Sequence, residues 1–433
     1  LGSIATVLAE SGNHYNILSN DPYYPFTRLM LNVFYYGLYT LIMMVAIYYS
    51  GVLIHRENES GVSEIVGASP YADWIMPASK TVALCFIAIA LLITAMLTSI
   101  ILQASAGYTN FEIGLYLKSL FVYTGFYYAM LCVLAVFIQI LAPNKWFGML
   151  LVFAAFIALA GLPSLGVEHI LVGFRIPFAI YSDMNGYGPA SAQVFSLIGY
   201  WGFFCILLLL AGHLFYRRSS YSTLRDRVRH ARLRTNRAVA STFAIAALGF
   251  ITVGCWIFYN TNILNQYRST KDQQQLLAEY ELNYGQYLRS PAPSYEQLSM
   301  EVDIYPEQRR LESRGHAILR NNKTFPINEF VMSVDPRAHV HNITVDSASL
   351  TKSDSTHGFY LFTLDAPLEP GKTVNVDWDM SRENRGFVNA DRDYEIVENG
   401  TFVESQHIAP IPGFDTDRFL SDDAWRKRFG LGP

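Results

Sequence analysis

The histidines and cysteines are the side chains of this sequence best suited to chemistry. There are ten histidines and four cysteines in 433 residues. No His-Glu-x-x-His pattern occurs, so the helical zinc site in which two histidines hold the metal and a glutamate activates water is missing. No glycine-rich phosphate loop ending in Lys-Ser or Lys-Thr occurs either. We therefore predict no catalytic residue and no metal site in this sequence, and neither ATP hydrolysis nor unaided peptide cleavage.

The individual histidines and cysteines form only weak patterns. All four cysteines fall inside apolar runs, which is typical of small buried hydrophobic residues and gives no spacing for a disulfide framework or a zinc ribbon. They are Cys85, Cys132, Cys205 and Cys255. His339 and His341 would share one face of a strand, where such pairs are usually exposed side chains. The pair Glu168-His169 is compatible with a proton or metal site, and more commonly with a polar cluster at a membrane interface.

Charged and turn-forming residues gather in one short segment between two apolar runs. The span Leu29–Ile54 holds no charged side chain, and it runs into His55-Arg56-Glu57-Asn58-Glu59-Ser60-Gly61. An amphipathic stretch follows and ends at Lys80, where the next apolar run begins. Arg56, Glu57, Glu59 and Glu64 are suited to polar contacts with a partner. The candidate contact segment is marked by Arg56, Glu57, Glu59, Gly61, Glu64, Ser69 and Pro70.

The apolar runs around this segment indicate a membrane protein. The composition is 51% hydrophobic, and six runs come near the roughly 20 residues that a helix needs to cross a bilayer. They are Leu29–Ile54, Thr81–Gln103, Leu120–Leu141, Trp146–Leu162, Val194–Tyr216 and Val239–Tyr259. Because they carry almost no charge, we predict a six-span α-helical membrane domain over 29–260, embedded in the lipid bilayer. The formal net charge of −4 gives no argument for nucleic-acid binding.

Basic residues predict the orientation of the spans. The connection Arg217–Arg237 carries eight arginines and a single acid, Asp226, so we expect it in the cytoplasm. It is either a helix lying on an anionic leaflet or only a determinant of topology. Alternation then places Arg56–Lys80 inside as well. The loop 1–28, the connection 163–193 and everything after residue 260 fall outside. Within 163–193 the sequence favours an outer re-entrant or interfacial hairpin, with Val167–Phe174 forming about two helical turns.

After Asn260 the composition becomes polar and the pattern changes. Gln266–Gln286 has apolar residues at helical spacing, which predicts an amphipathic helix, and 261–293 forms the linker that leaves the membrane. Seven short alternating runs follow at a spacing typical of antiparallel sheets. They are Met300–Ile304, His316–Leu319, Glu329–Val334, His341–Val345, Phe359–Leu364, Thr373–Trp378 and Thr401–Glu404. We predict an extracytoplasmic all-β domain over 294–433, built as a saddle or sandwich.

The first part of the chain resembles the second membrane half of an ABC type-2 exporter permease. The residues that carry this resemblance are Arg56-Glu57 after a span, Gly61, Ser63-Glu64, Ala68-Ser69-Pro70 and Lys80. The resemblance implies that this connection is the coupling helix, which docks on a nucleotide-binding ATPase subunit that holds the ATP. It also implies a second permease half or a homologous subunit as partner. The first span of this half would then lie upstream of Leu1, and the sixth span would deliver the C-terminal domain to the outside.

The last part of the chain resembles the N-terminal β domain of aminopeptidase-N-like zinc peptidases. The residues that carry this resemblance are Val302-Asp303-Ile304-Tyr305-Pro306, Arg309, Leu311, Gly315, Asn321–Ile327 and the turn Pro367–Gly371. The resemblance implies a domain that helps to wall the peptidase substrate cleft, with Gln406 as the residue that would line it. Zinc would be present only if a peptidase domain follows beyond Pro433.

Together these patterns predict a transporter subunit of the bacterial inner membrane that is part of a longer permease–peptidase fusion. Two alternatives stay open: a membrane-anchored scaffold of a zinc aminopeptidase, and a non-catalytic membrane complex that binds a partner. An anchor needs one span, so six spans favour the transporter. The sequence gives neither the transported substrate nor the direction of transport, and it gives no oligomeric state.

Overall fold

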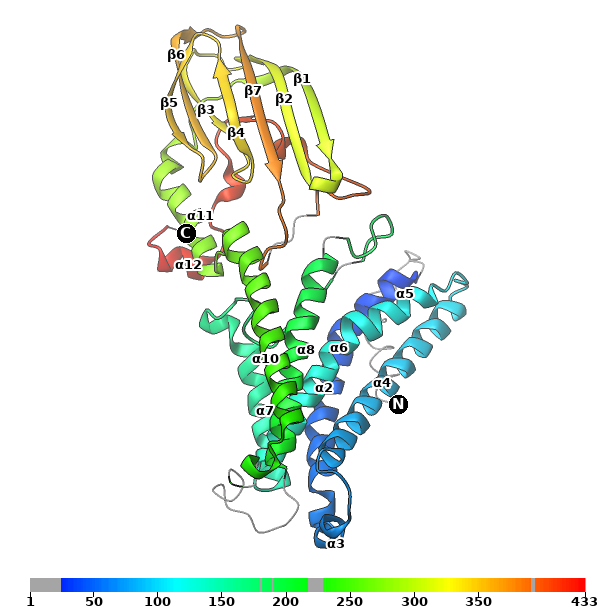
Figure 1. The fold of residues 1–433 in the computed structure, drawn as a ribbon. Helices are drawn as coiled ribbons and strands as arrows, with labels where there is room; N and C mark the ends of the chain where they lie inside the picture. The colour runs from blue at the N-terminus through cyan, green and yellow to red at the C-terminus, as the bar shows by residue number, and fades with distance from the viewer. Residues whose placement is uncertain are drawn as a thin grey trace. The chain divides into compact units, whose positions relative to one another are not determined.

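The computed structural model describes residues 25–179, 181–188, 190–216, 229, 231–390 and 394–432, without the side chains of 32–37. The chain separates into two compact units (Figure 1). The helical unit contains Leu1–Ser182 and Ala190–Tyr259, and the β unit contains Asp183–Pro189 and Asn260–Pro433. Most of the predicted N-terminal loop and most of the arginine-rich connection lie outside the described residues.

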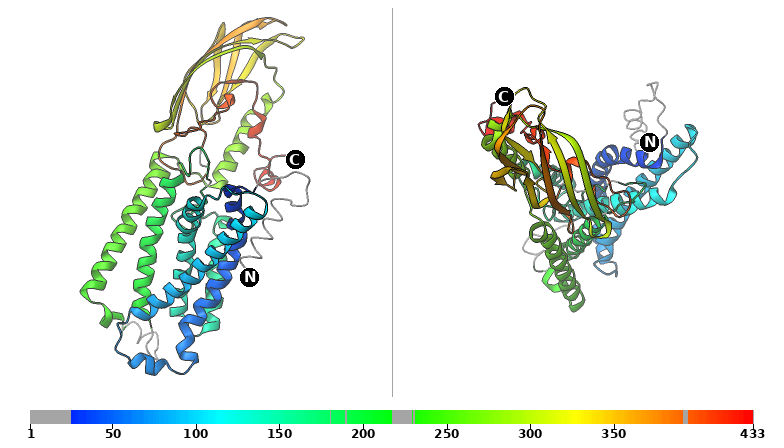
Figure 2. Two further views of the ribbon diagram at one scale, coloured as in Figure 1. Left: turned by 90° about the vertical axis from the view of Figure 1, so that its right-hand side faces the viewer. Right: turned by 90° about the horizontal axis from the view of Figure 1, so that it is seen from above.

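Long apolar helices that run alongside one another build the helical unit (Figures 1 and 2). The helices are α2 (Thr27–Glu59), α3 (Ser63–Ala68), α4 (Ile75–Ser105), α5 (Ile113–Leu117), α6 (Gly125–Leu141), α7 (Lys145–Gly161), α8 (Ala190–Phe215) and α10 (Arg237–Phe258). Asparagine side chains cap two of them. Asn144 accepts a hydrogen bond from the Phe147 amide at the start of α7, and Asn236 accepts one from the Val239 amide at the start of α10, both at 2.9 Å.

Among the described residues, five helical segments are long and apolar enough to cross a membrane. They are Leu38–Glu59, Ile75–Ser105, Ile113–Leu141, Ala190–Phe215 and Arg237–Leu264. The remaining predicted run, Trp146–Leu162, is the apolar helix α7, whose 17 residues cover about 25 Å at 1.5 Å per residue, somewhat less than the roughly 30 Å hydrocarbon core. Helix α2 has 33 residues and is therefore about 50 Å long. Its last turn extends beyond Ile54 and carries residues that the sequence had placed after the span.

The connection between α7 and α8 is irregular. It begins with the short 3-10 turn Pro163–Leu165. The predicted helical turns at Val167–Phe174 are wrong, because Gly173 and Phe174 adopt positive φ angles of 96° and 53°. Such left-handed backbone interrupts a right-handed helix. The placement of this connection outside the membrane stays a prediction.

Two four-stranded antiparallel sheets form most of the β unit, and Figure 2 shows their curvature. The strands are β1 (Ser294–Tyr305), β2 (Arg310–Arg320), β3 (Ile327–Ser333), β4 (His339–Val345), β5 (Ala348–Asp354), β6 (Phe359–Leu368), β7 (Thr373–Glu383) and β8 (Ile411–Pro412). One sheet has the order β1-β2-β7-β4 and the other β5-β6-β3-β8. The prediction of a C-terminal part rich in antiparallel sheets is confirmed.

The strand prediction has one wrong element and two missed elements, β5 and the two-residue strand β8. Thr401–Glu404 is not a strand, because Gly400 has a φ of 86° and the Thr401 hydroxyl closes a turn by donating to the Val397 carbonyl at 2.7 Å. Strand β5 was missed because its side chains are mostly polar and exposed, so no apolar alternation marks it.

The main core of the β unit lies between the inward faces of the two sheets. Leu319, Phe330, Phe362 and Val376 are all buried in it. Helix α11 (Thr270–Tyr284) begins at a capping box between Ser269 and Asp272 and packs Tyr280 and Tyr284 against a second cluster of buried residues. The short helix α12 (Asp423–Arg428) follows near the end of the chain. The predicted amphipathic helix is therefore present as α11.

Candidate functional site

The connection between α2 and α4 is built around the short helix α3. After α2 ends at Glu59, Gly61 turns the chain with a φ of 69°, a conformation that glycine adopts without strain. The Val62 amide donates to the Glu57 carbonyl at 3.1 Å and closes the turn. Helix α3 has six residues, and none of them is buried. Ser69 ends it with extended backbone, as expected for a residue that precedes a proline.

The charged residues predicted for this segment fall into two groups. Glu57 and Glu59 lie on the last turn of α2 and form ion pairs within the helical unit. The Lys80 ammonium donates to the Glu57 carboxylate, and Lys145 lies 2.7 Å from a Glu59 oxygen. Arg56 and Glu64 are exposed and point to solvent. The structure therefore brings the predicted residues to one end of the helical unit and leaves Arg56 and Glu64 accessible to a partner.

Lys80 holds the two sides of this connection together. Its side chain is only 7% exposed, and its ammonium also donates to the Ile54 carbonyl at 3.3 Å. It lies 5.8 Å from the ring centroid of Tyr216, at the end of α8. A buried lysine is costly unless it is paired and hydrogen-bonded, and these contacts satisfy it. Sequence reasoning took Lys80 as the start of a span, and only its position next to Glu57 in space reveals the pair.

Apolar side chains at this end of the molecule are exposed. Ile65 on α3 is 73% exposed and Trp74, just before α4, is 60% exposed, while Val62 is also exposed. Sequence reasoning concentrated on the charges and missed these residues. The sequence did hold a signal for this exposure. Ile65 lies in a short connection between two spans, and so short a segment cannot supply enough neighbouring residues to bury it.

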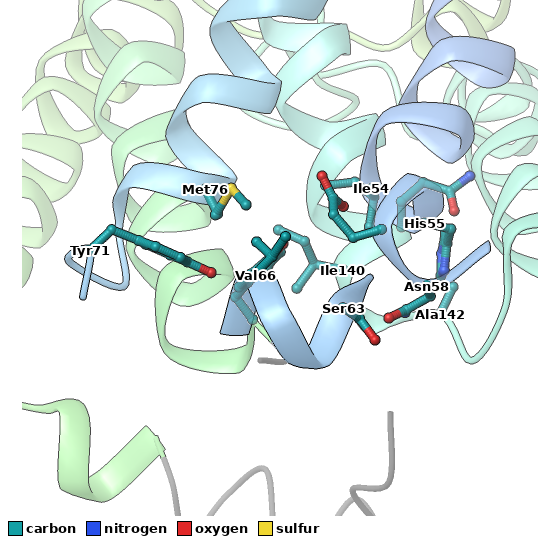
Figure 3. A pocket seen from close by; sticks show the side chains of 12 residues that line it. Ile54, His55, Asn58, Ser63, Val66, Tyr71, Met76, Ile140 and Ala142 are labelled. Carbon is teal, nitrogen blue, oxygen red and sulfur yellow. The ribbon is translucent and has the colours of Figure 1, made fainter. Parts of the chain in front are cut away.

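A pocket lies beside α3 (Figure 3). Its cavity volume is about 40 Å³, and it opens to solvent. Ser63 and Val66 from α3 line it, together with Met76 of α4 and Ile140 of α6. The inner side of α3 therefore borders a small pocket that is open to solvent.

A buried amide lies at the junction of α2, α6 and α7. Gln139 of α6 is fully buried, and among the described residues neither its amide nitrogen nor its amide oxygen has a hydrogen-bond partner. Two glycines make room for it. A Cβ on Gly148 would lie 2.0 Å from Gln139 Oε1, and a Cβ on Gly51 would lie 3.1 Å from Gln139 Nε2.

Gln406, the residue predicted to line a peptidase cleft, lies in the β unit on the short turn Ser405–His407. It is exposed, and its amide donates to Glu404 at 2.5 Å. The next residue, His407, bonds Glu395 at 2.9 Å, and Glu395 also accepts from Arg382 at 2.7 Å. This places the exposed Gln406 beside a charged network that extends into the interior of the β unit.

Asp335 belongs to the same network and neutralises part of the positive charge of the buried Arg382. The Arg382 side chain is 1% exposed and lies 3.6 Å from Asp335, which also pairs with Arg337 at 2.8 Å. Burial alone would raise the pKa of Asp335, but hydrogen bonds from Arg337 and the charges of both arginines outweigh it, so this pKa lies below its ordinary value. In the described part of the chain, no three His, Cys, Asp or Glu side chains lie close enough together to hold a metal ion.

The comparisons with known proteins bear on the helical unit. Residues 3–161 match the family model described as ABC-2 family transporter protein. This range includes α2, α3, α4, α6 and α7, and therefore the whole connection built around α3. No curated protein matches the chain. The match supports an ABC-2 transporter membrane component, and a permease of this family implies an ATPase partner and a membrane location.

Proposed function

We propose that this chain is the transmembrane subunit of an ABC type-2 exporter, driven by a separate ATPase subunit that docks on α3. The match of residues 3–161 to an ABC-2 transporter family supports the membrane part of this proposal. The observation that carries the docking site is α3 itself. It is a water-exposed helix without a buried residue, joined directly to two long apolar helices. An anchor for the β unit would need one span, whereas the described residues contain five candidate spans.

The surface of α3 has the character of a docking site. Ile65 and Val62 present apolar surface to solvent, and Glu64 adds a charge between them. A partner that covers this surface gains hydrophobic contact at the centre and polar contacts at the rim, which is the usual anatomy of a protein interface. We assign Ile65 as the apolar anchor and Arg56 and Glu64 as the polar contacts. Gly61, Ser69 and Pro70 shape the two turns that present α3.

Glu57 and Glu59 support the docking site through ion pairs within the helical unit. Their ion pairs with Lys80 and Lys145 tie the end of α2 to α4 and α7. A force applied to α3 by an ATPase would therefore reach these helices together. Alternating access in such a permease is the rocking of helices against a second permease half or a homologous subunit.

For the β unit we propose a position outside the cytoplasm. With the shorter helix α7 counted as a crossing, the helices α4, α6, α7 and α8 separate the α3 connection from the arginine-rich connection. This even number puts both connections in the cytoplasm, and α10 then carries the chain across the membrane. The resemblance to the N-terminal domain of aminopeptidase-N-like peptidases supports a longer permease–peptidase fusion in the bacterial inner membrane. Zinc would then belong to a peptidase domain outside this sequence, whose cleft Gln406 would help to line.

Co-purification tests the docking proposal. The native chain, extracted in mild detergent, should bring an ATPase subunit with it, and Ile65→Glu should lose that subunit. Leu165→Glu is the matched control, because Leu165 is 79% exposed in another connection of the helical unit. Equal recovery of the ATPase with Ile65→Glu and Leu165→Glu would contradict docking on α3.

A further inference from the structure

Arg234 connects two segments that lie far apart in the sequence. Its Nε lies 3.0 Å from Oδ2 of Asp73, in the connection between α3 and α4. The Nη1 of the same guanidinium donates to the Tyr216 carbonyl at 2.6 Å, with longer hydrogen bonds of 3.4 and 3.5 Å to the Leu214 and His213 carbonyls. All of these residues belong to the helical unit.

Different nitrogens of the Arg234 guanidinium contact a carboxylate and the backbone carbonyls at the end of α8. The last carbonyls of a helix have no partner within the helix, and they carry the negative end of its dipole. Arg234 satisfies these groups at the end of α8 with one nitrogen and pairs a carboxylate with another. A lysine has no fixed fork of donors and cannot reproduce both contacts in one geometry. Arg234 is only 16% exposed, so it is turned into the protein and away from solvent or a lipid surface.

Further contacts reinforce the same link. The ring of His213 lies close to the backbone of Asp73. The Lys80 ammonium, paired with Glu57, lies over the ring of Tyr216. The end of α8 therefore contacts both the segment that follows α3 and the first turns of α4. Helix α8 in turn packs against α6 and α10.

From this arrangement we infer that Arg234 is a positioning residue that passes the movement of docked α3 to α8. The inference rests on the proposed function, since it takes α3 as the ATPase docking site. This role differs from the two predicted for the arginine-rich connection, which were to set the topology and to lie on an anionic leaflet. The movement would pass from α3 through Asp73 and Arg234 to the end of α8.

Hydrogen exchange of the native complex with its co-purified ATPase, with and without ATP and vanadate, separates the two proposals. Protection of residues 63–70 by the ATPase reports docking. An ATP-dependent change in exchange at residues 209–216 reports transmission to α8. We expect both signals in the unsubstituted chain. In Asp73→Asn and in Arg234→Lys we expect the first signal to stay and the second to be abolished.

The control is Arg232→Gln, which removes an exposed arginine two positions away and should keep both signals. Arg234→Lys keeps the charge, so it guards against a variant that merely fails to fold. Variants that keep the change at 209–216 would overturn the inference while leaving the docking proposal intact. Loss of both signals in Asp73→Asn would also overturn it, because the pair would then only hold α3 in place. Absence of protection at 63–70 in the unsubstituted chain would refute the proposed function, and the inference with it.

Discussion

Gly315 and Trp378 face one another across β2 and β7, so closely that a Cβ on Gly315 would lie 2.0 Å from Trp378 Cζ2. The Trp378 indole occupies the space that the Cβ of any residue larger than glycine would take at position 315. Its Nε1 donates to the Ser313 hydroxyl at 3.3 Å. Trp378 is buried in the main core of the β unit. Gly315 is therefore required here for space, and this gives a physical reason for one of the residues that carry the resemblance to the peptidase β domain.

Gly315→Ala should destabilise the β unit, because the added methyl group must displace a buried indole that has no room to move. We expect a loss of about 1–3 kcal/mol, as for other overpacked cores. Faster hydrogen exchange of β2 and β7 in the full chain would measure it. Gly285→Ala is the control, since the nearest atom to a Cβ there is the Glu281 side chain at 4.0 Å. Equal exchange in the two variants would show that Trp378 adapts.

Lys80→Met should loosen the connection around α3, because it leaves the Glu57 carboxylate without its buried cation. The unpaired carboxylate is partly exposed, so we expect a cost of about 1–3 kcal/mol. Thermal unfolding of the detergent-solubilised chain gives the measurement. The double variant Lys80→Met with Glu57→Gln should recover part of the loss, and additive losses would argue against a coupled pair.

Acid should weaken the β unit through Asp335. The folded-state pKa of this carboxyl is depressed, so the folded state binds its proton less tightly than the unfolded state. Its contribution to stability is complete above the unfolded pKa of about 3.9 and is lost as the pH falls through the lower folded-state pKa. Asp335→Asn should flatten this part of the pH profile and destabilise the unit at neutral pH by about 2–3 kcal/mol, since Glu395 still pairs with Arg382.

Circular dichroism of the full chain between pH 2 and pH 6 would follow this loss. Asp365→Asn serves as the control, because Asp365 is exposed and should leave the profile unchanged. A profile of Asp335→Asn that follows the unsubstituted chain would show that other groups govern acid unfolding.

The sidedness of the two units can be measured with single cysteines. In a chain whose four native cysteines are replaced by alanine, Ser349→Cys on exposed β5 should react with an impermeant maleimide in intact spheroplasts. Glu64→Cys on α3 should react only after permeabilisation, because the proposed topology puts it in the cytoplasm. Labelling in the opposite order would place the β unit inside the cell.

Much of the fold could be predicted because buried faces of helices and strands produce apolar runs or regular spacings of apolar residues in the sequence. The apolar runs predicted α4, α6 and α8 in nearly their observed places. Alternation predicted the strands from β1 to β7, with the exception of β5, whose polar exposed residues carry no such pattern. At Thr401–Glu404 the alternation was misleading, since a threonine hydroxyl and a left-handed glycine form a turn there.

The site was predictable only in part. Residue types and a break between two spans identified the segment around α3. The roles of its charges depend on partners that are distant in sequence, such as Lys145 for Glu59 and Arg234 for Asp73. No periodicity encodes such pairs. The exposure of Ile65 likewise depends on how few neighbours a six-residue helix acquires.

The buried amide of Gln139 also constrains how this chain can vary among its relatives. The side chain fits only because position 148 lacks a Cβ, which would lie 2.0 Å from Gln139 Oε1, and it gains no hydrogen bond in return from the described residues. An added Cβ at position 51 would be crowded first by Met149, whose Cε would lie 2.6 Å away. A glutamine at 139 should therefore be accompanied by glycine at 148, whereas the residue at 51 should vary with the side chain at 149 as well as with the one at 139.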